Sequence, residues 1–175
     1  GSIQIDGCNL ASMDRKMRAQ KMSVVLTDNI SVPNTTVHDI VALGRFPYTN
    51  WYGILSEHDE EIILQSIQTV GLQDFAYRNI NTLSDGERQR VMIAKALAQD
   101  TPFILLDEPT DGLDPNQKEH LRKSIQNLAK HKIIIISTHL LDDVSQMCNR
   151  ILVMSQGKII ADDKPDIILK NTNSY

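Results

Sequence analysis

Two adjacent carboxylates follow a short apolar run in the second half of the chain. Residues Phe103 to Leu106 are continuously apolar, which is typical of a strand covered on both faces in a parallel sheet. Asp107 and Glu108 come directly after it, where open α/β sheets gather their active sites. An aspartate there can bind Mg²⁺, and the glutamate beside it can polarise a water. The alternative is a pair of solvated acids at a strand end, which is common for charged side chains.

A histidine occupies the same kind of position after the next predicted strand. The segment "KIIIISTH" (132–139) predicts another fully buried strand, and His139 lies just past its end. Neighbouring parallel strands end side by side, so we expect His139 to lie near Glu108. A neutral imidazole there could donate a hydrogen bond to a terminal phosphate. The alternative is an ordinary histidine exposed at the end of a strand.

A predicted helix begins with residues that suit an anion. In "LSDGE", Ser84 and Glu87 have the spacing of a capping box, so a helix is expected to start at Ser84. The first turn of a helix binds anions through its free N–H groups and its dipole. Gly86 would let a ligand approach the backbone, and the Ser84 hydroxyl adds a donor. The alternative is a simple capped helix with no ligand.

The surrounding elements predict an α/β fold. From Phe103 onward the order is strand, helix, strand, helix, which implies parallel strands with helices packed across them. Asp114 is expected to cap a helix that has Pro115 in its first turn. The middle of the chain looks mostly helical, so we expect one domain, 1–175, with a helical subdomain at about 33–99 and a sheet core from 1–32 and 100–175. Other expected elements are strands in "SIQIDG" (2–7) and "KMSVVLTD" (21–28), helices in "TVHDIVALGR" (36–45, ending near Gly44), Ser56–Val70 and "KPDIILKN" (164–171), and a hairpin in "RILVMSQGKII" (150–160).

Composition narrows the class of protein. A chain of 175 residues can form one ordinary domain, and its net charge of −4 argues against a general nucleic-acid binder. Cys8 and Cys148 lie far apart in the sequence and suggest a reducing compartment rather than a disulfide framework.

Together these segments resemble the ATP-binding subunit of ABC transporters. "LSDGERQ" (83–89) is similar to the signature motif of that family, and "FILLDEPT" (103–110) to its Walker B strand with the catalytic glutamate. "DGLD" (111–114) resembles the D-loop and "STH" (137–139) the switch-histidine region. The resemblance covers nearly the whole chain, from "GSIQIDG" to "VMSQGKII". "TVHDIVALGRFPY" is similar to the branch that serves importers of iron–siderophore, haem and cobalamin.

The resemblance implies a P-loop NTPase-like core that uses ATP and Mg²⁺. Asp107 would hold the Mg²⁺ site, Glu108 would be the general base for the water that attacks the γ-phosphate, and His139 would contact that phosphate. The residues that would face the nucleotide of a second subunit, or work across the same interface, are Ser84, Gly86, Glu87 and Asp114.

The resemblance also implies partners and a location. They are transmembrane permease subunits, a second copy of the ATPase subunit and, indirectly, a periplasmic or surface substrate-binding protein, with no nucleic acid. The implied location is cytoplasmic, peripheral on the inner face of the cell membrane.

Two positions depart from the family pattern. The phosphate-binding loop G-x-x-x-x-G-K-[ST] does not occur, and the only Gly-Lys pair is followed by Ile159. We therefore expect an N-terminally truncated ABC ATPase that does not hydrolyse ATP alone, and that self-associates, swaps elements or rearranges locally at its uncovered sheet. Asp28 aligns with the Q-loop glutamine that touches Mg²⁺; a carboxylate can bind a cation but donates no hydrogen bond while ionised.

A cluster of aromatic residues leaves two interpretations open. Phe46, Tyr48, Trp51 and Tyr52 are half of the chain's aromatic residues. They form either a small core for the helical subdomain or part of the surface that receives a coupling helix of the transmembrane subunit. For the whole chain, the alternatives to an importer ATPase are a non-catalytic ATPase-like interaction module and a soluble ABC ATPase of translation or DNA repair. The last usually carries two such domains or a long coiled-coil insertion, and this sequence shows neither.

Overall fold

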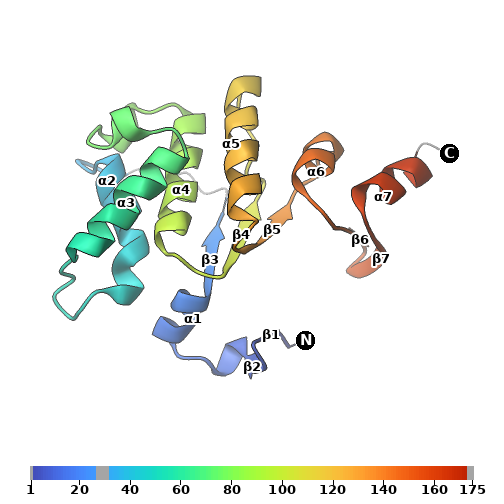
Figure 1. Ribbon diagram of the computed structural model, residues 1–175, viewed down its shortest axis with the longest axis horizontal. Helices are drawn as coiled ribbons and strands as arrows, with labels where there is room; N and C mark the ends of the chain where they lie inside the picture. Colours follow the sequence, from blue (N-terminus) through green and yellow to red (C-terminus); the bar gives the residue numbers. More distant parts are fainter. Residues whose placement is uncertain (1, 27–31, 173–175) are drawn as a thin grey trace. The chain divides into compact units, whose positions relative to one another are not determined.

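The computed structural model describes residues 2–26 and 32–172. The chain divides into two compact units, Gly1–Ser137 and Thr138–Tyr175. The described residues of the first unit form a short hairpin, helices and a parallel sheet, whereas those of the second unit form two helices and one hairpin (Figure 1).

The first unit begins with a hairpin and a short helix. Strands β1 (Gln4–Ile5) and β2 (Cys8–Asn9) pair antiparallel around Asp6 and Gly7, which have φ of 51° and 76°. The strand and turn predicted in "SIQIDG" are thus confirmed. The 3₁₀ helix η1 (Leu10–Ser12) and the α-helix α1 (Arg15–Lys21) follow, and neither was predicted.

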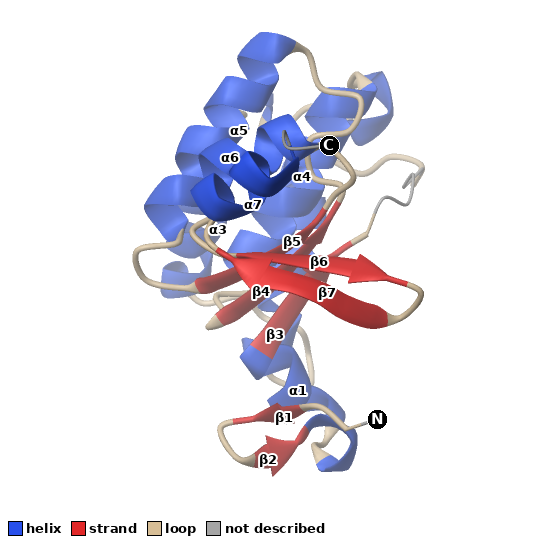
Figure 2. Cartoon of the chain, turned by 90° about the vertical axis from the view of Figure 1, so that its right-hand side faces the viewer, coloured by secondary structure: helices blue, strands red, loops and turns tan. Residues whose placement is uncertain are grey.

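Three parallel strands form the sheet of the first unit in the order β3-β4-β5. They are β3 (Met22–Val25), β4 (Phe103–Asp107) and β5 (Ile133–Ser137), and they run side by side in Figure 2. Val24 lies opposite Leu105, and Leu105 lies opposite Ile135. The expected parallel sheet is confirmed.

The two faces of this sheet differ in burial. Val25, Ile104 and Leu106 are buried on one face, but Ile133 and Ile135 of β5 are 56% and 54% exposed on the other. The prediction of a fully buried strand in "KIIIISTH" was therefore wrong, and β4 is likewise only half-buried at its alternate positions. A continuous apolar run predicts a strand, but it does not fix how many faces are covered, because successive side chains point to opposite faces.

Three packed helices dominate residues 33–99, as the sequence predicted (Figure 1). Each starts with a capping box, made by Thr36, Ser56 and Ser84 respectively. The predicted stop near Gly44 is confirmed for the α-helix, which ends at Ala42, and the chain continues through Gly44 as a 3₁₀ helix. The elements are α2 (Val37–Ala42), η2 (Leu43–Tyr48), α3 (Glu57–Thr69), η3 (Gln73–Phe75), η4 (Ile80–Thr82) and α4 (Asp85–Ala98).

Helix α5 (Pro115–Leu128) connects β4 to β5. The Asp114 carboxylate accepts a hydrogen bond from the Gln117 backbone N–H at 2.9 Å, which confirms the predicted cap. Leu121 and Ile125 of α5 are buried.

The second unit contains α6 (Leu141–Met147), β6 (Ile151–Ser155), β7 (Lys158–Asp163) and α7 (Pro165–Thr172). Strands β6 and β7 form the predicted hairpin, and Arg150 and Asp162 tie it with two hydrogen bonds of 2.7 Å.

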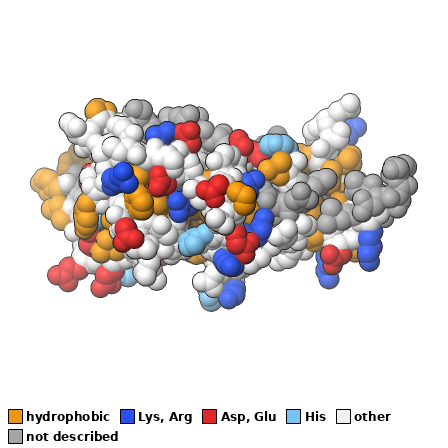
Figure 3. Space-filling model, turned by 90° about the horizontal axis from the view of Figure 1, so that it is seen from above, with side chains coloured by type: hydrophobic (Ala, Val, Ile, Leu, Met, Phe, Trp, Pro, Cys, Tyr) orange, Lys and Arg blue, Asp and Glu red, His pale blue; other side chains and the backbone are white. Residues whose placement is uncertain are grey.

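Two surface properties complete the fold. Among the described residues, every helix is too short or too polar to cross a bilayer. Acidic, basic and apolar side chains are interspersed on the face seen in Figure 3. A surface of mixed sign attracts polyanions less than a patch of one sign does.

Candidate functional site

The Asp107–Glu108 pair lies at the carboxyl end of β4 and is fastened to β5. The Ser137 hydroxyl donates a hydrogen bond to the Asp107 carboxylate, and the Glu108 backbone N–H donates to the Ser137 carbonyl at 2.9 Å. Glu108 has a φ of 44°, in the left-handed region that a residue with a Cβ seldom adopts. Such strain persists where the surrounding structure imposes it, and it is frequent at active sites.

The turn after this pair is held by its own hydrogen bonds. The backbone N–H of Asp111 donates to the Glu108 carbonyl at 3.1 Å, and that of Gly112 donates to the Asp111 carboxylate at 3.0 Å. Gly112 has a φ of 68°, which favours glycine. The turn ends at Asp114, whose side chain caps α5.

The start of α4 is a complete capping box. The Ser84 hydroxyl accepts from the Glu87 N–H at 3.3 Å. The Glu87 carboxylate accepts from both the N–H and the hydroxyl of Ser84 at 2.7 Å. Burial raises the pKa of Glu87, but the hydrogen bonds from Ser84 outweigh it, and the net pKa is lowered. The first turn of α4 therefore carries a negative charge that its own cap holds in place.

Gly86 brings the start of α4 against the start of α5. A Cβ on Gly86 would lie 2.4 Å from Gln117 Oε1 and 2.9 Å from Leu113 Cδ2. From the sequence we expected Gly86 to allow a ligand to approach the backbone, and no local pattern predicted its contact with α5. The structure thus brings residues 84–87 together with residues 113–117, and the contact of Gly86 with a ligand stays a prediction.

Two predicted site residues are not placed relative to this group. Asp28 lies outside the described residues. His139 is an exposed residue near the start of the second unit, where the Leu140 N–H donates to the Thr138 hydroxyl at 3.1 Å. Its expected proximity to Glu108 stays a prediction.

The residues present fit Mg²⁺ bound together with nucleotide. Within the residues that the structure describes, no three His, Cys, Asp or Glu side chains gather to hold a metal ion. Mg²⁺ commonly binds through one or two carboxylates, waters and substrate phosphates. One carboxylate, that of Asp107, held by Ser137 at a strand end, suits that mode.

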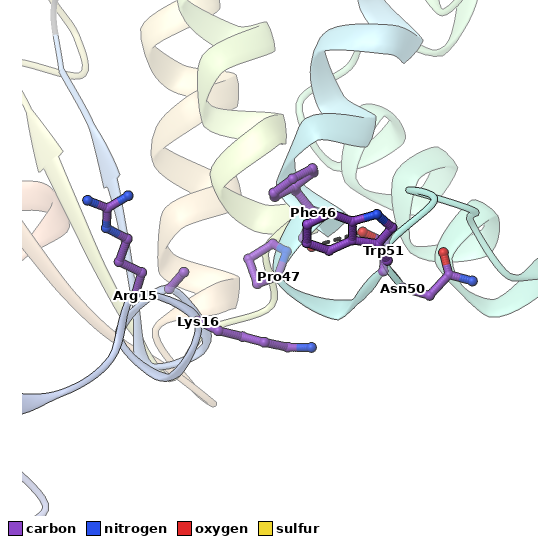
Figure 4. Close-up of a pocket in the computed structure, with 8 residues that line it drawn as sticks. Arg15, Lys16, Phe46, Pro47, Asn50 and Trp51 are labelled. Atoms are coloured by element: carbon purple, nitrogen blue, oxygen red, sulfur yellow. Dashed lines mark hydrogen bonds between the residues drawn. The ribbon is translucent and has the colours of Figure 1, made fainter.

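A pocket of about 590 Å³ lies between α1 and the segment that follows α2. Arg15 and Lys16 come from one side of it, and Phe46, Pro47 and Trp51 come from the other (Figure 4). We call this the aromatic pocket; its lining residues are Arg15, Lys16, Ala19, Phe46, Pro47, Thr49, Asn50 and Trp51.

The aromatic residues around this pocket are mostly exposed. Phe46, Trp51 and Tyr52 are 72%, 97% and 83% exposed, so their interpretation as a core of the helical subdomain was wrong. Exposed aromatic clusters of this kind mark interaction sites.

The fold is that of an ATP-binding cassette. A bacterial ABC transporter cassette solved as a dimer matches 94% of this chain over 73% of its own length, with a TM-score of 0.80 and 28% identity. Residues 1–111 match the sequence pattern of the family described as ABC transporter, and the chain belongs to that family.

Two relatives carry names that specify what they import. The petrobactin import ATP-binding protein FpuD of Bacillus anthracis is 34% identical over 171 residues, 97% of this chain and 63% of that protein. The iron(3+)-hydroxamate import ATP-binding protein FhuC of Bacillus subtilis is 32% identical over 162 residues, 91% of this chain and 60% of that protein. The chain thus spans less than two thirds of the length of these relatives.

Proposed function

We propose that this chain is part of the ATP-hydrolysing subunit of an ABC importer for an iron–siderophore or a related metal chelate. The observation that carries the proposal is the Asp107–Glu108 pair at the end of β4, held by Ser137 in the same unit as the capped start of α4. The names of FpuD and FhuC support the choice of cargo.

In the proposed reaction Glu108 takes a proton from the water whose oxygen bonds to the γ-phosphorus of ATP, while the bond from that phosphorus to the bridging oxygen breaks and ADP leaves. Its left-handed backbone and the hydrogen bond from its N–H to Ser137 set the direction of its Cα–Cβ bond before substrate arrives, and phosphoryl transfer depends mostly on positioning. Asp107 holds Mg²⁺, which supplies positive charge to the phosphates when bound. His139 contacts the γ-phosphate.

The second copy of the subunit is proposed to meet the nucleotide through α4. Ser84, Gly86 and Glu87 face the nucleotide of the other subunit, and Asp114 works across the same interface. The contact of Gly86 with Leu113 and Gln117 supports this grouping, because it joins the two segments within one subunit.

The aromatic pocket is proposed as the site where a cytoplasmic segment of the permease docks. Its apolar rings suit an apolar helix face, and Arg15 and Lys16 suit a carboxylate on that segment. We propose accordingly that the subunit works on the inner face of the membrane, with the substrate-binding protein as an indirect partner.

Without a G-x-x-x-x-G-K-[ST] loop among its 175 residues, we propose that the chain alone neither binds Mg-ATP tightly nor hydrolyses it. A non-catalytic interaction module is the second candidate, and the same missing loop favours it. The Asp107–Glu108 pair and its hydrogen bonds to Ser137 favour the first candidate, the ATP-hydrolysing subunit.

A chimera separates the two candidates. The 171 aligned residues of FpuD are replaced by those of this chain, so that FpuD supplies the rest of the protein. The importer account expects Mg-ATP binding by calorimetry and hydrolysis that falls by about 10² or more in Glu108→Gln. A chimera that binds Mg-ATP but hydrolyses it no faster than its Glu108→Gln variant would establish the interaction module. Tight Mg-ATP binding by the chain alone would refute the inactivity proposal.

A further inference from the structure

One wall of the aromatic pocket is fastened to the last turn of α4 by a buried arginine. Arg45 lies in η2, directly before the pocket residues Phe46 and Pro47, and is only 4% exposed. Its Nη1 donates to the Ala98 carbonyl at 2.8 Å. Ala98 is the last residue of α4, and carbonyls at a helix end have no partner within the helix. The guanidinium therefore caps this helix, where a positive charge is also favoured by the helix dipole.

The same arginine reaches the start of α3. Its Nε donates to Asp59 Oδ1 at 2.8 Å. The other carboxylate oxygen, Oδ2, accepts from the N–H and the hydroxyl of Ser56 at 2.9 and 2.6 Å. One buried ion pair thus joins η2, the first turn of α3 and the last turn of α4.

The backbone of η2 also lies directly against α4. A Cβ on Gly44 would lie 2.3 Å from the Lys95 carbonyl oxygen and 3.0 Å from the Gln99 backbone nitrogen. Because the nearest atoms belong to helix backbone, no side-chain movement could relieve the contact. Gly44 and Arg45 therefore hold the segment before the pocket on α4 by two independent means.

The opposite wall of the pocket is fastened to the same turn. Gln99, the C-cap residue of α4, donates from Nε2 to the carbonyls of Ala19 and Met22 at 2.6 and 3.1 Å. Ala19 is a lining residue of the pocket. Gln20 joins the two walls directly, since its Nε2 donates to the Pro47 carbonyl at 3.1 Å.

We propose that Arg45 and Gln99 are positioning residues that make both walls of the aromatic pocket move with α4 as one body. A displacement of the pocket is then passed along the 14 residues of α4, roughly 20 Å, to the turn that carries Ser84. The inference rests on the proposed function only where it takes a permease segment as the source of that displacement.

Distances between spin labels test this attachment in the chain as it stands. In a Cys8→Ser, Cys148→Ser background, one label replaces Asp85 at the start of α4. A second replaces either Tyr52, beside the pocket, or Met17 on α1; all three side chains are exposed. Pulsed electron paramagnetic resonance is expected to give one narrow distance distribution for each pair, because hydrogen-bonded rigid elements transmit position.

The variants address the two walls separately. Arg45→Met is expected to broaden the distribution of distances between labels 52 and 85 about twofold. Arg45→Lys is expected to give an intermediate width, because an ammonium can reach one of the two acceptors. Gln99→Leu is expected to broaden the 17–85 distribution. Lys123→Ala, which removes an exposed ion pair with Glu119 on α5, is the matched control and is expected to change neither.

Unchanged widths in folded Arg45→Met or Gln99→Leu, with folding checked by far-ultraviolet circular dichroism, would overturn the proposal for the corresponding wall. If Arg45→Met does not fold, Arg45→Lys decides for its wall, because it is expected to be intermediate between the parent and a released segment. The measurement needs neither nucleotide nor permease. Failure of the proposed function would appear in the chimera's hydrolysis while these widths stay as expected.

Discussion

The two ends of α4 are built in different ways. At its start, Ser84 and Glu87 satisfy each other within one turn. At its end, Arg45 reaches Ala98 across 53 residues and Gln99 reaches Ala19 across 80. The first end holds its shape from local contacts, whereas the second depends on the packing of the whole helical region. A structural change elsewhere in the helical region should therefore displace the end of α4 beside the pocket more than its start.

Each end also has a glycine in close contact, and the partners differ. Gly86 meets side chains of α5, which can move, but Gly44 meets the backbone of α4 itself. The end beside the pocket is thus the less tolerant of the two.

Removing the buried arginine should have the largest effect on stability. Arg45→Met leaves Asp59 charged and buried, so we expect the free energy of unfolding to fall by about 3–5 kcal/mol. Arg88→Met at the other end breaks a pair with the exposed Asp85 and a hydrogen bond of 2.9 Å to the Leu83 carbonyl, and should cost about 1–2 kcal/mol. Urea titrations of both variants measure the two losses of unfolding free energy. Equal losses would show that the two ends of α4 do not differ in how they are stabilised.

The glycines should follow the same order. Gly44→Ala is expected to cost about 2–3 kcal/mol, because its Cβ meets backbone. Gly86→Ala should stay within about 1 kcal/mol of the parent, since Gln117 can swing aside and alanine favours the helix. Thermal unfolding measures both. A larger loss for Gly86→Ala would reverse our assignment of the less tolerant end.

Acid should weaken the end beside the pocket. Hydrogen bonds from Ser56, and then from Arg45, outweigh the opposing effect of burial and lower the pKa of Asp59 from 3.8 to about 2. A carboxylate whose pKa is lower in the folded state stabilises the fold at pH values above its unfolded-state pKa. This stabilisation is lost as the pH falls through the folded-state pKa. We expect about 2 kcal/mol to disappear between about pH 4 and pH 2.

The pH dependence can be assigned with Asp59→Asn. Urea titrations across that range should show a smaller loss for this variant than for the parent. The same slope in both proteins would assign the acid sensitivity to other groups.

The smallest effect is expected at the local cap. Ser84→Ala should cost about 1 kcal/mol, and hydrogen exchange should accelerate only in the first turn of α4. Thr36→Ala, which removes the equivalent cap of α2, is the matched control with a loss of similar size. Faster exchange at Ala98 and Gln99 in Ser84→Ala would mean that the two ends are not built independently.

What the sequence predicted follows the same division. The capping box at Ser84, the cap at Asp114 and the Asp-Glu pair at the carboxyl end of β4 are local patterns, and the structure has each of them. The parallel order of β4 and β5 followed from the strand–helix–strand pattern.

What the sequence missed depends on distant contacts. A charged pair such as Arg45 and Asp59 is ordinarily expected at the surface, and its burial depends on three helices meeting. The contact of Gly44 with α4 was missed for the same reason, because it joins segments that are far apart in the sequence. The exposure of Ile133 and Ile135 depends on which face of the sheet is covered, and a continuous apolar run does not predict which face that is.

The most direct test of the central claim is petrobactin-dependent iron uptake by a Bacillus anthracis strain that lacks the petrobactin import ATP-binding protein FpuC and in which the chimera replaces FpuD. The account predicts that the chimera supports uptake. It also predicts that Glu108→Gln, which removes the proposed general base, and Trp51→Ala in the aromatic pocket each abolish most of that uptake. A chimera that hydrolyses ATP but supports no uptake, or one whose uptake survives Glu108→Gln, would contradict it.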